Sequence, residues 1–545
     1  MANITCTSIL LAAIALALPA TAFAQGDICP RPAVGDPAKS PPDLYSDNGV
    51  LQVALNYYST TDGHNRTRDC FKTADGKLSP TLHVLPGDTL DIALTNMASK
   101  SAAVSRPAET ADDTKYCGSK TLTLDSVNLH FDGVTTSPKC HSDDVFMSVN
   151  SGKTFQYNVK IPANEPPGLY WYHPTVHGLQ VAAVSGGASG AIVVDGIDRL
   201  QPAVKHLLKR LLVLRDLPLE HAPKMNTGNP NVPTADLSLN YVPILYPRYT
   251  PSVIAMHAGA QEFWRVVNAS ANTQADLQVV YDGVAQPLQI AGLDGVPTGS
   301  DDGRHKGTIV TQTDIFLPAG GRAEFIVQAP STSVKVAQLI TLGVVSGPDG
   351  MSDPRRALAD IHTTTDPHWL PPSPERFATA ANDSTGEPSF DGVPLQRTLN
   401  LTEAVIRNRH APAGGAEYFI TVEGQSPCLS GNCPPGVVTH KGAVEDWTIV
   451  NQTHEVHEFH INQVHYLLLE VNGKPIPKDQ RQFYDTHQVD YWTGTGPYPS
   501  IKVRLDFRGP VAGEFLYHCH ILDHADAGMF GKIVVTKGPP VIGAN

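Results

Sequence analysis

A short segment near the C-terminus most constrains how this chain can fold. It contains His518, Cys519 and His520 in succession, followed by His524 and Met529. On a β-strand, successive side chains point to opposite faces, so His518 and His520 would share one face and Cys519 would lie on the other. A thiolate, imidazoles and a weak thioether are the ligands of a blue type 1 copper site. The segment therefore predicts a strand with a different metal site on each face. A free buried cysteine with incidental histidines is the alternative.

Length and composition predict several β-rich units. The chain of 545 residues exceeds the usual size of one domain. It contains 45 Gly and 45 Pro, and only 17% of its residues are charged, a mixture that favours short strands and turns over long helices. The net charge of −13 argues against nucleic acid as the main partner. We therefore expect an all-β fold and a small-molecule substrate or a redox partner.

A strand–turn–strand phrase recurs along the chain. It occupies residues 82–96 and 315–327, and a shorter variant occupies residues 447–451. Such repetition predicts related β-sandwich units. The segment 361–393, which contains a Pro-rich stretch that begins at Pro371, has the character of a linker. The predicted domains are residues 25–200, 201–395 and 396–545.

The first 24 residues predict a cleaved export signal. The run Ile9 to Leu18 is apolar, and Ala22-Phe23-Ala24 is a small-x-small cleavage site, although no Lys or Arg precedes the run. No later run is long enough to span a membrane. We therefore expect a protein of the periplasm or the extracellular space without a membrane span.

The cysteine count agrees with an oxidising compartment. Of eight cysteines, Cys6 lies in the predicted signal, and an odd number remains, which leaves one thiol for another task. We expect that thiol to be Cys519. The pairing we favour, among the fifteen that six cysteines allow, is Cys428–Cys433 as a tight loop, Cys117–Cys140 around the first histidine motif, and Cys29–Cys70 by elimination.

Three further histidine motifs precede the C-terminal one. They occupy residues 128–133, 171–178 and 457–462. Together with residues 518–520, the four motifs in this order resemble those of the multicopper oxidases, the laccase and copper-efflux-oxidase family. The resemblance covers essentially the whole mature chain. It implies three consecutive cupredoxin-like Greek-key β-sandwich domains, the third of which contains a type 1 copper site.

The resemblance also implies the roles of the type 1 residues. The ligands of the type 1 copper would be His457, Cys519, His524 and Met529. Of these, His457, Cys519 and His524 would be the catalytic residues, because in the family the type 1 copper takes electrons singly from a substrate. The Cys-His path then conducts them to a trinuclear copper cluster that reduces dioxygen to water.

The trinuclear cluster of the family is held by histidines in i, i+2 pairs, since residues two apart on a strand share a face. The corresponding pairs in this chain are His130/Asp132, His173/Thr175, His460/Asn462 and His518/His520. Asp132, Thr175 and Asn462 therefore stand at positions where the family has imidazoles.

The surviving ligands are unevenly distributed. The resemblance assigns His130 and His460 to the type 2 copper, and both are retained. One type 3 copper would keep His173 and His520, with Asp132 as its third ligand. A set of two histidines and one carboxylate suits iron(II), manganese or zinc as well as copper. Another divalent metal is thus an alternative to copper in this cluster.

The second type 3 copper would retain only His518, with Thr175 and Asn462 beside it. Hydroxyl and amide oxygens are poor copper ligands compared with imidazole. We therefore expect this copper to be absent or weakly bound, which would abolish the usual four-electron reduction of oxygen. In addition, Ala525 replaces an acidic residue that delivers protons in many family members, while Asp143 and Asp144 are candidates for another acidic position near the first motif.

Three nearby histidines are candidates for replacing the lost ligands. His177 lies two residues beyond Thr175, His465 lies on the opposite strand face from Asn462, and His141 belongs to a loop. We expect none of them to bind the cluster metals.

Three hypotheses about function follow. The first is an exported copper-dependent oxidoreductase that oxidises a small organic or phenolic substrate and has an altered cluster. The second is a non-catalytic electron-transfer or copper-binding protein, and the third is a structural descendant without catalysis. The complete type 1 set around Cys519 argues against the third. The surviving cluster histidines argue against the second, since an electron carrier does not need them. We therefore favour the first.

Overall fold

The computed structural model describes residues 27–63, 66–99, 117–219, 231–300, 303–364, 394–406, 415–427 and 433–539. The predicted export signal, Cys428 and most of the predicted linker lie outside these residues. Among the described residues strands predominate, which confirms the all-β prediction. The helical elements are short: α1 (Gln180–Ser185), α2 (Ile197–Leu200), α3 (Leu522–Asp526), η1 (Pro202–Val204) and η2 (Lys478–Gln480). None of the helices in the described part of the chain has the length and apolarity needed to cross a bilayer.

The N-terminal third forms two sheets. In order within the first, the strands are β1 (Asp43–Tyr45), β4 (Thr81–Val84), β9 (Gly190–Val194), β8 (Gly168–His173) and β6 (His130–Asp132). Within the second they are β3 (Thr67–Thr73), β2 (Val50–Thr61), β5 (Thr89–Asn96) and β7 (Thr154–Lys160).

The middle third also forms two large sheets. The first contains β12 (Val242–Ile244), β11 (Ala235–Leu239), β10 (Leu208–Pro218), β14 (Gln261–Asn268), β21 (Arg322–Gln328), β17 (Leu288–Leu293) and β18 (Val296–Pro297), with β19 (Val310–Gln312) beside β17. The second contains β13 (Ser252–His257), β25 (Arg356–Thr364), β22 (Ala337–Leu342), β15 (Ala275–Tyr281) and β16 (Val284–Ala285), with β20 (Ile315–Leu317) beside β15. A small ribbon joins β23 (Val344–Val345) and β24 (Ser352–Asp353).

The C-terminal third repeats this arrangement. One sheet contains β27 (Gly415–Val422), β26 (Leu395–Ile406), β29 (Val444–Asn451), β35 (Ser500–Asp506), β31 (Tyr466–Val471) and β32 (Lys474–Pro475), with β33 (Phe483–Tyr484) beside β31. The other contains β28 (Val437–His440), β37 (Phe530–Thr536), β36 (Gly513–Cys519), β30 (His457–Ile461) and β34 (Thr486–Val489).

The three thirds share one topology. In each, a hairpin strand lies parallel to a later strand, which in turn pairs antiparallel with a third: β2, β5 and β7; β10, β14 and β21; β26, β29 and β35. The opposing sheets match in the same way, through β4, β9 and β8, through β13, β25 and β22, and through β28, β37 and β36. Each third has its own apolar core. The repetition predicted from the sequence is therefore present as three related β-sandwiches.

The first two repeated strand–turn–strand segments each connect the two sheets of a sandwich. Both strands predicted within residues 82–96 form, as β4 and β5, but they belong to different sheets. The same holds for β20 and β21 in the second phrase. The turn between them therefore moves the chain from one sheet to the other. One boundary differs from the prediction, because β25 continues to Thr364, into the segment expected to be linker, where it pairs with β13.

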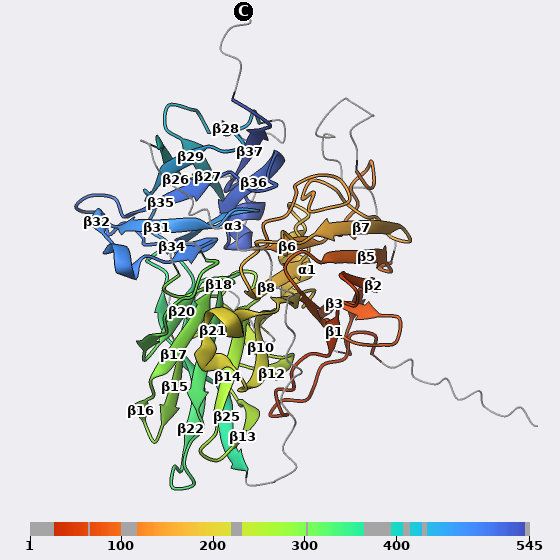
Figure 1. Cartoon of the computed structure of the whole chain (residues 1–545), viewed down its shortest axis with the longest axis vertical. Coiled ribbons are helices and arrows are strands. Elements are labelled where there is room, and N and C mark those ends of the chain that lie inside the picture. Colours follow the sequence, from red (N-terminus) through yellow and green to blue (C-terminus); the bar gives the residue numbers. More distant parts are fainter. Residues whose placement is uncertain are drawn as a thin grey trace, which may run out of the picture.

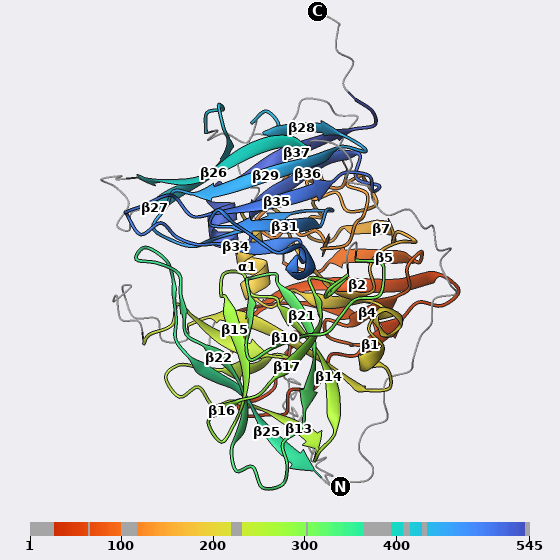
Figure 2. The same ribbon diagram turned by 60° about the vertical axis from the view of Figure 1, so that its left-hand side comes forward.

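The metal-binding motifs lie where the first and third sandwiches meet. In Figure 1, β6, β8 and α1 lie beside α3 near the centre of the molecule, between the orange and blue groups of strands. Figure 2 shows the green middle group below this junction. Strand β8 is buried along its whole length, because its Trp171 packs on Leu211 and Val213 of β10. Alternating burial, as in β5, is the pattern of a strand with one solvent-facing side.

Candidate metal centres

The disulfides leave Cys519 as the free thiol of the described cysteines. Cys29–Cys70 and Cys117–Cys140 are bonded as predicted. Cys433 is also disulfide-bonded, and its predicted partner, Cys428, lies outside the described residues. Cys519 is buried and unpaired, as expected for a cysteine reserved for another role.

Cys519 converges with two histidines on one face of β36. The Nδ1 atoms of His457 and His524 lie 3.0 Å apart, and the Sγ atom of Cys519 lies 3.8 and 3.7 Å from them. All three side chains are buried. Met529 is buried in the same apolar core, and its carbonyl accepts the backbone N–H of Cys519 at 3.0 Å.

Neighbouring groups orient the two imidazoles. Thr453 Oγ1 is 2.9 Å from Nε2 of His457. The His524 ring stacks on Tyr418, with ring centroids 4.2 Å apart, and its Nε2 faces Glu455 Oε2 at 3.6 Å. Because the outward nitrogens have these neighbours, both Nδ1 atoms point to the space beside the sulfur. Outer contacts of this kind fix histidine ligands in metal sites.

Burial sets the protonation states of this first centre. It lowers the pKa of His524 to about 3 and holds the pKa of His457 well below its usual value. Both imidazoles are therefore neutral near pH 7, the form in which they bind metal. Burial also raises the pKa of the Cys519 thiol, so a bound cation is required to stabilise its thiolate. This donor set fits a type 1 copper.

The opposite face presents imidazoles around one carboxylate. Oδ2 of Asp132 lies 3.2 Å from Nε2 of His520, 3.5 Å from that of His173, 3.7 Å from that of His460 and 3.9 Å from that of His130. Two groups of potential ligands share this residue: His130, Asp132 and His460, and Asp132, His173 and His520. The sequence assigned Asp132 to the second group only. All five side chains are buried.

The first and third sandwiches contribute to this centre in equivalent ways. His130 of β6 is directly opposite His173 of β8, and His460 of β30 is directly opposite His518 of β36. Since β8 and β36 occupy corresponding places in their sheets, the two strand pairs bring their histidines to one interface.

Most of these imidazoles have an acceptor at their Nδ1 atom. His130 donates to Asp143 at 2.9 Å, His460 contacts Thr486 Oγ1 at 2.8 Å, and His173 and His518 donate to the carbonyls of Pro174 and Cys519 at 2.9 Å. Burial lowers the pKa of His173 to about 4 and that of His518 to about 3. The Nε2 atoms of His173 and His460 have no hydrogen-bond partner among the described residues. His173, His460 and His518 are therefore neutral imidazoles near pH 7, and the unpartnered nitrogens of His173 and His460 can each offer a lone pair to a metal.

The replaced positions do not supply a third metal position. The hydroxyl of Thr175 donates to Gln180 Oε1 at 3.1 Å. The amide of Asn462 lies 3.2 Å from Nε2 of His130. His518 belongs to neither ligand group of the described residues. The residues present therefore do not fit the three-copper cluster implied by the resemblance.

The nearby histidines have other surroundings. His177 packs on Phe530, with ring centroids 4.0 Å apart. His465 donates to the carbonyl of Asp294 at 2.8 Å, and His141 stacks on Phe155 at the surface. None of them belongs to a ligand group of the described residues.

Arg322 is the residue of this centre that sequence reasoning missed. It begins β21 of the middle sandwich, and its Nη1 lies 3.3 Å from Oδ1 of Asp132 and 2.7 Å from Oδ1 of Asp485. Its side chain is fully buried. Despite burial, which lowers it, the pKa of Arg322 is raised by Asp485 and Asp294, so the guanidinium stays charged. The one sequence signal was an arginine within the second repeated phrase, directly after Gly320 and Gly321.

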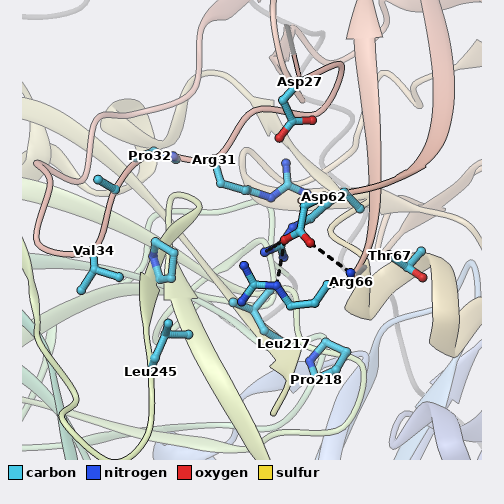
Figure 3. Close-up of a pocket in the computed structure, with 13 residues that line it drawn as sticks. Asp27, Arg31, Pro32, Val34, Asp62, Arg66, Thr67, Leu217, Pro218 and Leu245 are labelled. Atoms are coloured by element: carbon cyan, nitrogen blue, oxygen red, sulfur yellow. Dashed lines mark hydrogen bonds and ion pairs between the residues drawn. The ribbon is translucent and has the colours of Figure 1, made fainter. Parts of the chain in front are cut away.

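A separate cavity of 410 Å³ lies away from both centres. Its lining includes Arg31, Asp62, Arg66 and Leu217, and no residue of the two metal centres. Figure 3 shows Asp62 facing the arginines of this cavity, and its Oδ2 lies 2.8 Å from Nε of Arg66. Asp62 thus pairs with two of the arginines, Arg66 and Arg68.

Comparisons with known proteins agree with this arrangement. Family models described as multicopper oxidase match residues 121–198 and 399–539. The multicopper oxidase mco of Staphylococcus haemolyticus (strain JCSC1435) is 34% identical over 97 residues, which is 17% of this chain and 20% of that protein. The laccase of Bacillus subtilis (strain 168) is 28% identical over 112 residues, or 17% of this chain and 21% of that protein. The chain thus aligns with about a fifth of the length of these curated relatives.

Solved structures resemble the chain over nearly its whole length. The 2F4 variant of the McoA multicopper oxidase from Aquifex aeolicus has a TM-score of 0.66 at 18% identity, covering 92% of this chain and 99% of that one. A multicopper oxidase from Campylobacter jejuni, described as a metallo-oxidase, has a TM-score of 0.62 at 20% identity, covering 93% and 96%. The likeness confirms the predicted fold of consecutive cupredoxin-like Greek-key β-sandwiches.

Proposed function

Because the chain belongs to the multicopper oxidase family, we propose that it is an exported copper-dependent oxidoreductase that takes electrons from a small organic or phenolic substrate at a type 1 copper. The observation that carries this proposal is the convergence of the thiol of Cys519 with the Nδ1 atoms of His457 and His524, at 3.7–3.8 Å on one buried face. A type 1 copper, when bound there, supplies reversible one-electron chemistry.

The residues of the chain hold this site and link it to the second centre. His457, Cys519, His524 and Met529 would hold the copper. Cys519 is also bonded through the backbone to His518 and His520, which face the second centre. In the proposed reaction a phenol gives up one electron and one proton to become a phenoxyl radical. The electron would then move along strand β36 toward the second centre.

The second centre supports an altered outcome for that electron. With Asp132, Thr175 and Asn462 in place of imidazoles, we propose that this centre does not perform the normal four-electron reduction of oxygen. Oxygen is then reduced only partly, or another acceptor is used. Export is supported by the two disulfides, because disulfides persist in oxidising compartments.

The proposal is tested by the oxidation of 2,6-dimethoxyphenol with copper-reconstituted protein, while oxygen uptake and hydrogen peroxide are recorded together. We expect a blue protein that oxidises the phenol, with fewer than four phenol equivalents oxidised per oxygen molecule consumed. The Cys519→Ser variant is the control and should lack both the blue colour and the activity.

Two results would contradict parts of the proposal. A blue protein that oxidises no phenol or aromatic amine with any acceptor would favour the non-catalytic electron carrier. Four phenol equivalents oxidised per oxygen molecule, without peroxide, would show that the second centre performs ordinary oxidase chemistry.

A further inference from the structure

We propose that the second centre is a two-metal site in which the Asp132 carboxylate bridges two divalent ions, with Arg322 as the residue that positions this carboxylate. The two-metal site is a more specific form of the altered second centre, so it rests on that part of the proposed function. It does not depend on the type 1 site, so an experiment can contradict the two-metal site without contradicting the type 1 copper, and the reverse.

The first argument is the shared position of Asp132. Its Oδ2 atom is within 3.9 Å of all four Nε2 atoms of His130, His173, His460 and His520. These imidazoles divide into two pairs, each of which forms a compact ligand group with Asp132. One carboxylate thus completes two separate sets of donors.

The second argument is the chemistry of the substitution. A neutral imidazole nitrogen has one lone pair and binds one metal, whereas a carboxylate offers about four lone-pair positions on two oxygens. An aspartate at position 132 can therefore serve two ions where a histidine would serve one. This replacement changes the type of site as well as removing a ligand.

The third argument is that the carboxylate is held in one orientation. Oδ1 of Asp132 faces Nη1 of Arg322 at 3.3 Å, which leaves Oδ2 directed to the imidazoles. Arg322 is itself fixed, because Asp485 accepts from both of its terminal nitrogens and the carbonyl of Gly320 accepts from Nη1 at 3.0 Å. A guanidinium has no lone pair to give a metal, so Arg322 acts by positioning.

The packing leaves room for this arginine. Gly133, which directly follows Asp132, has a φ of +82°, and a Cβ atom built there would collide with Nη2 of Arg322 and with Asp485. The backbone beside the carboxylate is thus shaped to receive a guanidinium from the middle sandwich. The arginine is part of the centre, although it comes from a different third of the chain.

The fourth argument is that the imidazoles are already oriented to bind metal. Nε2 atoms of His173 and His460 are buried without a hydrogen-bond partner among the described residues, which is costly unless a ligand satisfies them. His130 and His460 are oriented from behind by Asp143 and Thr486. Histidine and carboxylate donors together suit first-row divalent ions such as Zn²⁺, Mn²⁺, Fe²⁺ and Cu²⁺.

The test uses Zn²⁺ as the probe in the Cys519→Ser background, which removes the sulfur ligand of the type 1 site. Crystals soaked in ZnCl₂ and measured on both sides of the zinc absorption edge should show two anomalous peaks, one beside each histidine pair and both adjacent to Asp132. One peak at this centre, or three, would overturn the two-metal proposal.

Asp132→Asn tests the bridge with almost no change in volume. In this variant the number of zinc ions at the centre should fall from two to at most one. Asp526→Asn is the matched control, because it makes the same change in a carboxylate near α1 that lies outside both ligand groups, and it should retain two. Two fully occupied peaks in Asp132→Asn would overturn the bridging role.

Arg322→Gln tests the positioning role. Loss of outer contacts typically weakens metal binding about 10- to 100-fold, so the second zinc ion should bind at least about tenfold more weakly by isothermal titration, and Arg322→Lys should restore part of the affinity. Unchanged affinity for both ions in a folded Arg322→Gln variant would overturn this role. If the variant does not fold, the peak count and Asp132→Asn still decide the two-metal proposal.

Discussion

The two faces of strand β36 differ in how their metal centres are assembled. The face with Cys519 draws His457, His524 and Met529 from the same sandwich, which also supplies the immediate neighbours Thr453, Tyr418 and Glu455. The opposite face requires all three sandwiches: His130, Asp132 and His173 from the first, Arg322 from the middle, and His460, His518 and His520 from the third. The first centre therefore depends on local folding, and the second depends on how the sandwiches meet.

This difference explains which centre could change. A site confined to one sandwich loses its chemistry when one ligand changes. At a junction, a new charge from one sandwich can be matched by another, as Arg322 does for Asp132 at 3.3 Å. Breaking a buried ion pair by removing one partner typically costs about 3–5 kcal/mol, so the loss of either Asp132 or Arg322 should destabilise the junction. The following predictions test this contrast, beginning with the largest effect.

Cys519→Ser should produce the largest difference in metal binding between the two faces of β36. Because serine oxygen does not replace the thiolate of a type 1 copper, the blue absorption and all activity that depends on it should disappear. The metal content of the second centre should remain the same, which elemental analysis measures. Residual blue colour would contradict the type 1 assignment, and a parallel loss of metal at the second centre would contradict its independence.

Combined replacement of Asp132, Thr175 and Asn462 by histidine should make the second face resemble that of the wider family. We expect the copper content to rise toward four ions per chain and laccase activity to appear. Overpacking in a buried site typically costs about 1–3 kcal/mol, so the thermal midpoint of the metal-free triple variant should lie below that of the metal-free parent. Asn462→His alone is the comparison variant. A triple variant that folds but gains no copper would show that further residues exclude the third ion.

The pH dependence of stability should reflect the buried imidazoles of both faces. In the folded chain the pKa values of His173, His518 and His524 are lowered from 6.5 to about 4, about 3 and about 3. Between pH 6.5 and these values, each of these three histidines binds more protons in the unfolded chain than in the folded chain, so its contribution to stability falls as the pH falls through this window. Each such histidine contributes up to about 1.4 kcal/mol per pH unit. Buried carboxyls such as Glu458, whose pKa burial raises to about 7, contribute in the opposite direction.

The measurement is urea unfolding of the metal-free protein between pH 7 and 4, a range in which these groups contribute to the pH dependence. His524→Gln should reduce the proton uptake on unfolding by about one proton in this range. The same pH dependence in the variant and the parent would contradict the lowered pKa of His524.

Thr453→Val should have the smallest effect. It removes the group 2.9 Å from Nε2 of His457 without removing a ligand. Net hydrogen-bond contributions are about 0.5–1.5 kcal/mol, so stability should fall by about that amount, and the blue band should broaden while its intensity persists. Loss of the band would show that Thr453 contributes directly to copper binding.

The sequence predicted what local spacing determines. Local spacing predicted that Cys519, His524 and Met529 lie together, because they occupy one strand and the short loop that follows it, whereas His457 was assigned by the resemblance to the multicopper oxidases. The repeated phrases predicted related sandwiches for the same reason, although the turn inside each phrase proved to connect two sheets. The expected domain limits near residues 200 and 395 remain predictions.

The sequence could not predict contacts between distant segments. Asp132 and Arg322 are separated by 190 positions, and no periodicity relates a strand of the first sandwich to the start of β21. The participation of Asp132 in both ligand groups also depends on how the first and third sandwiches dock. Spacing along one strand identifies which residues share a face, but the partner of that face comes from the tertiary structure.

The most direct test of the contrast between the faces is the copper content of the reconstituted and desalted protein, measured by elemental analysis together with the blue absorption. The account predicts one blue copper and at most two further ions, so that no more than three metal ions are bound per chain. Four coppers per chain would contradict it, because a complete trinuclear cluster would then assemble despite Asp132, Thr175 and Asn462.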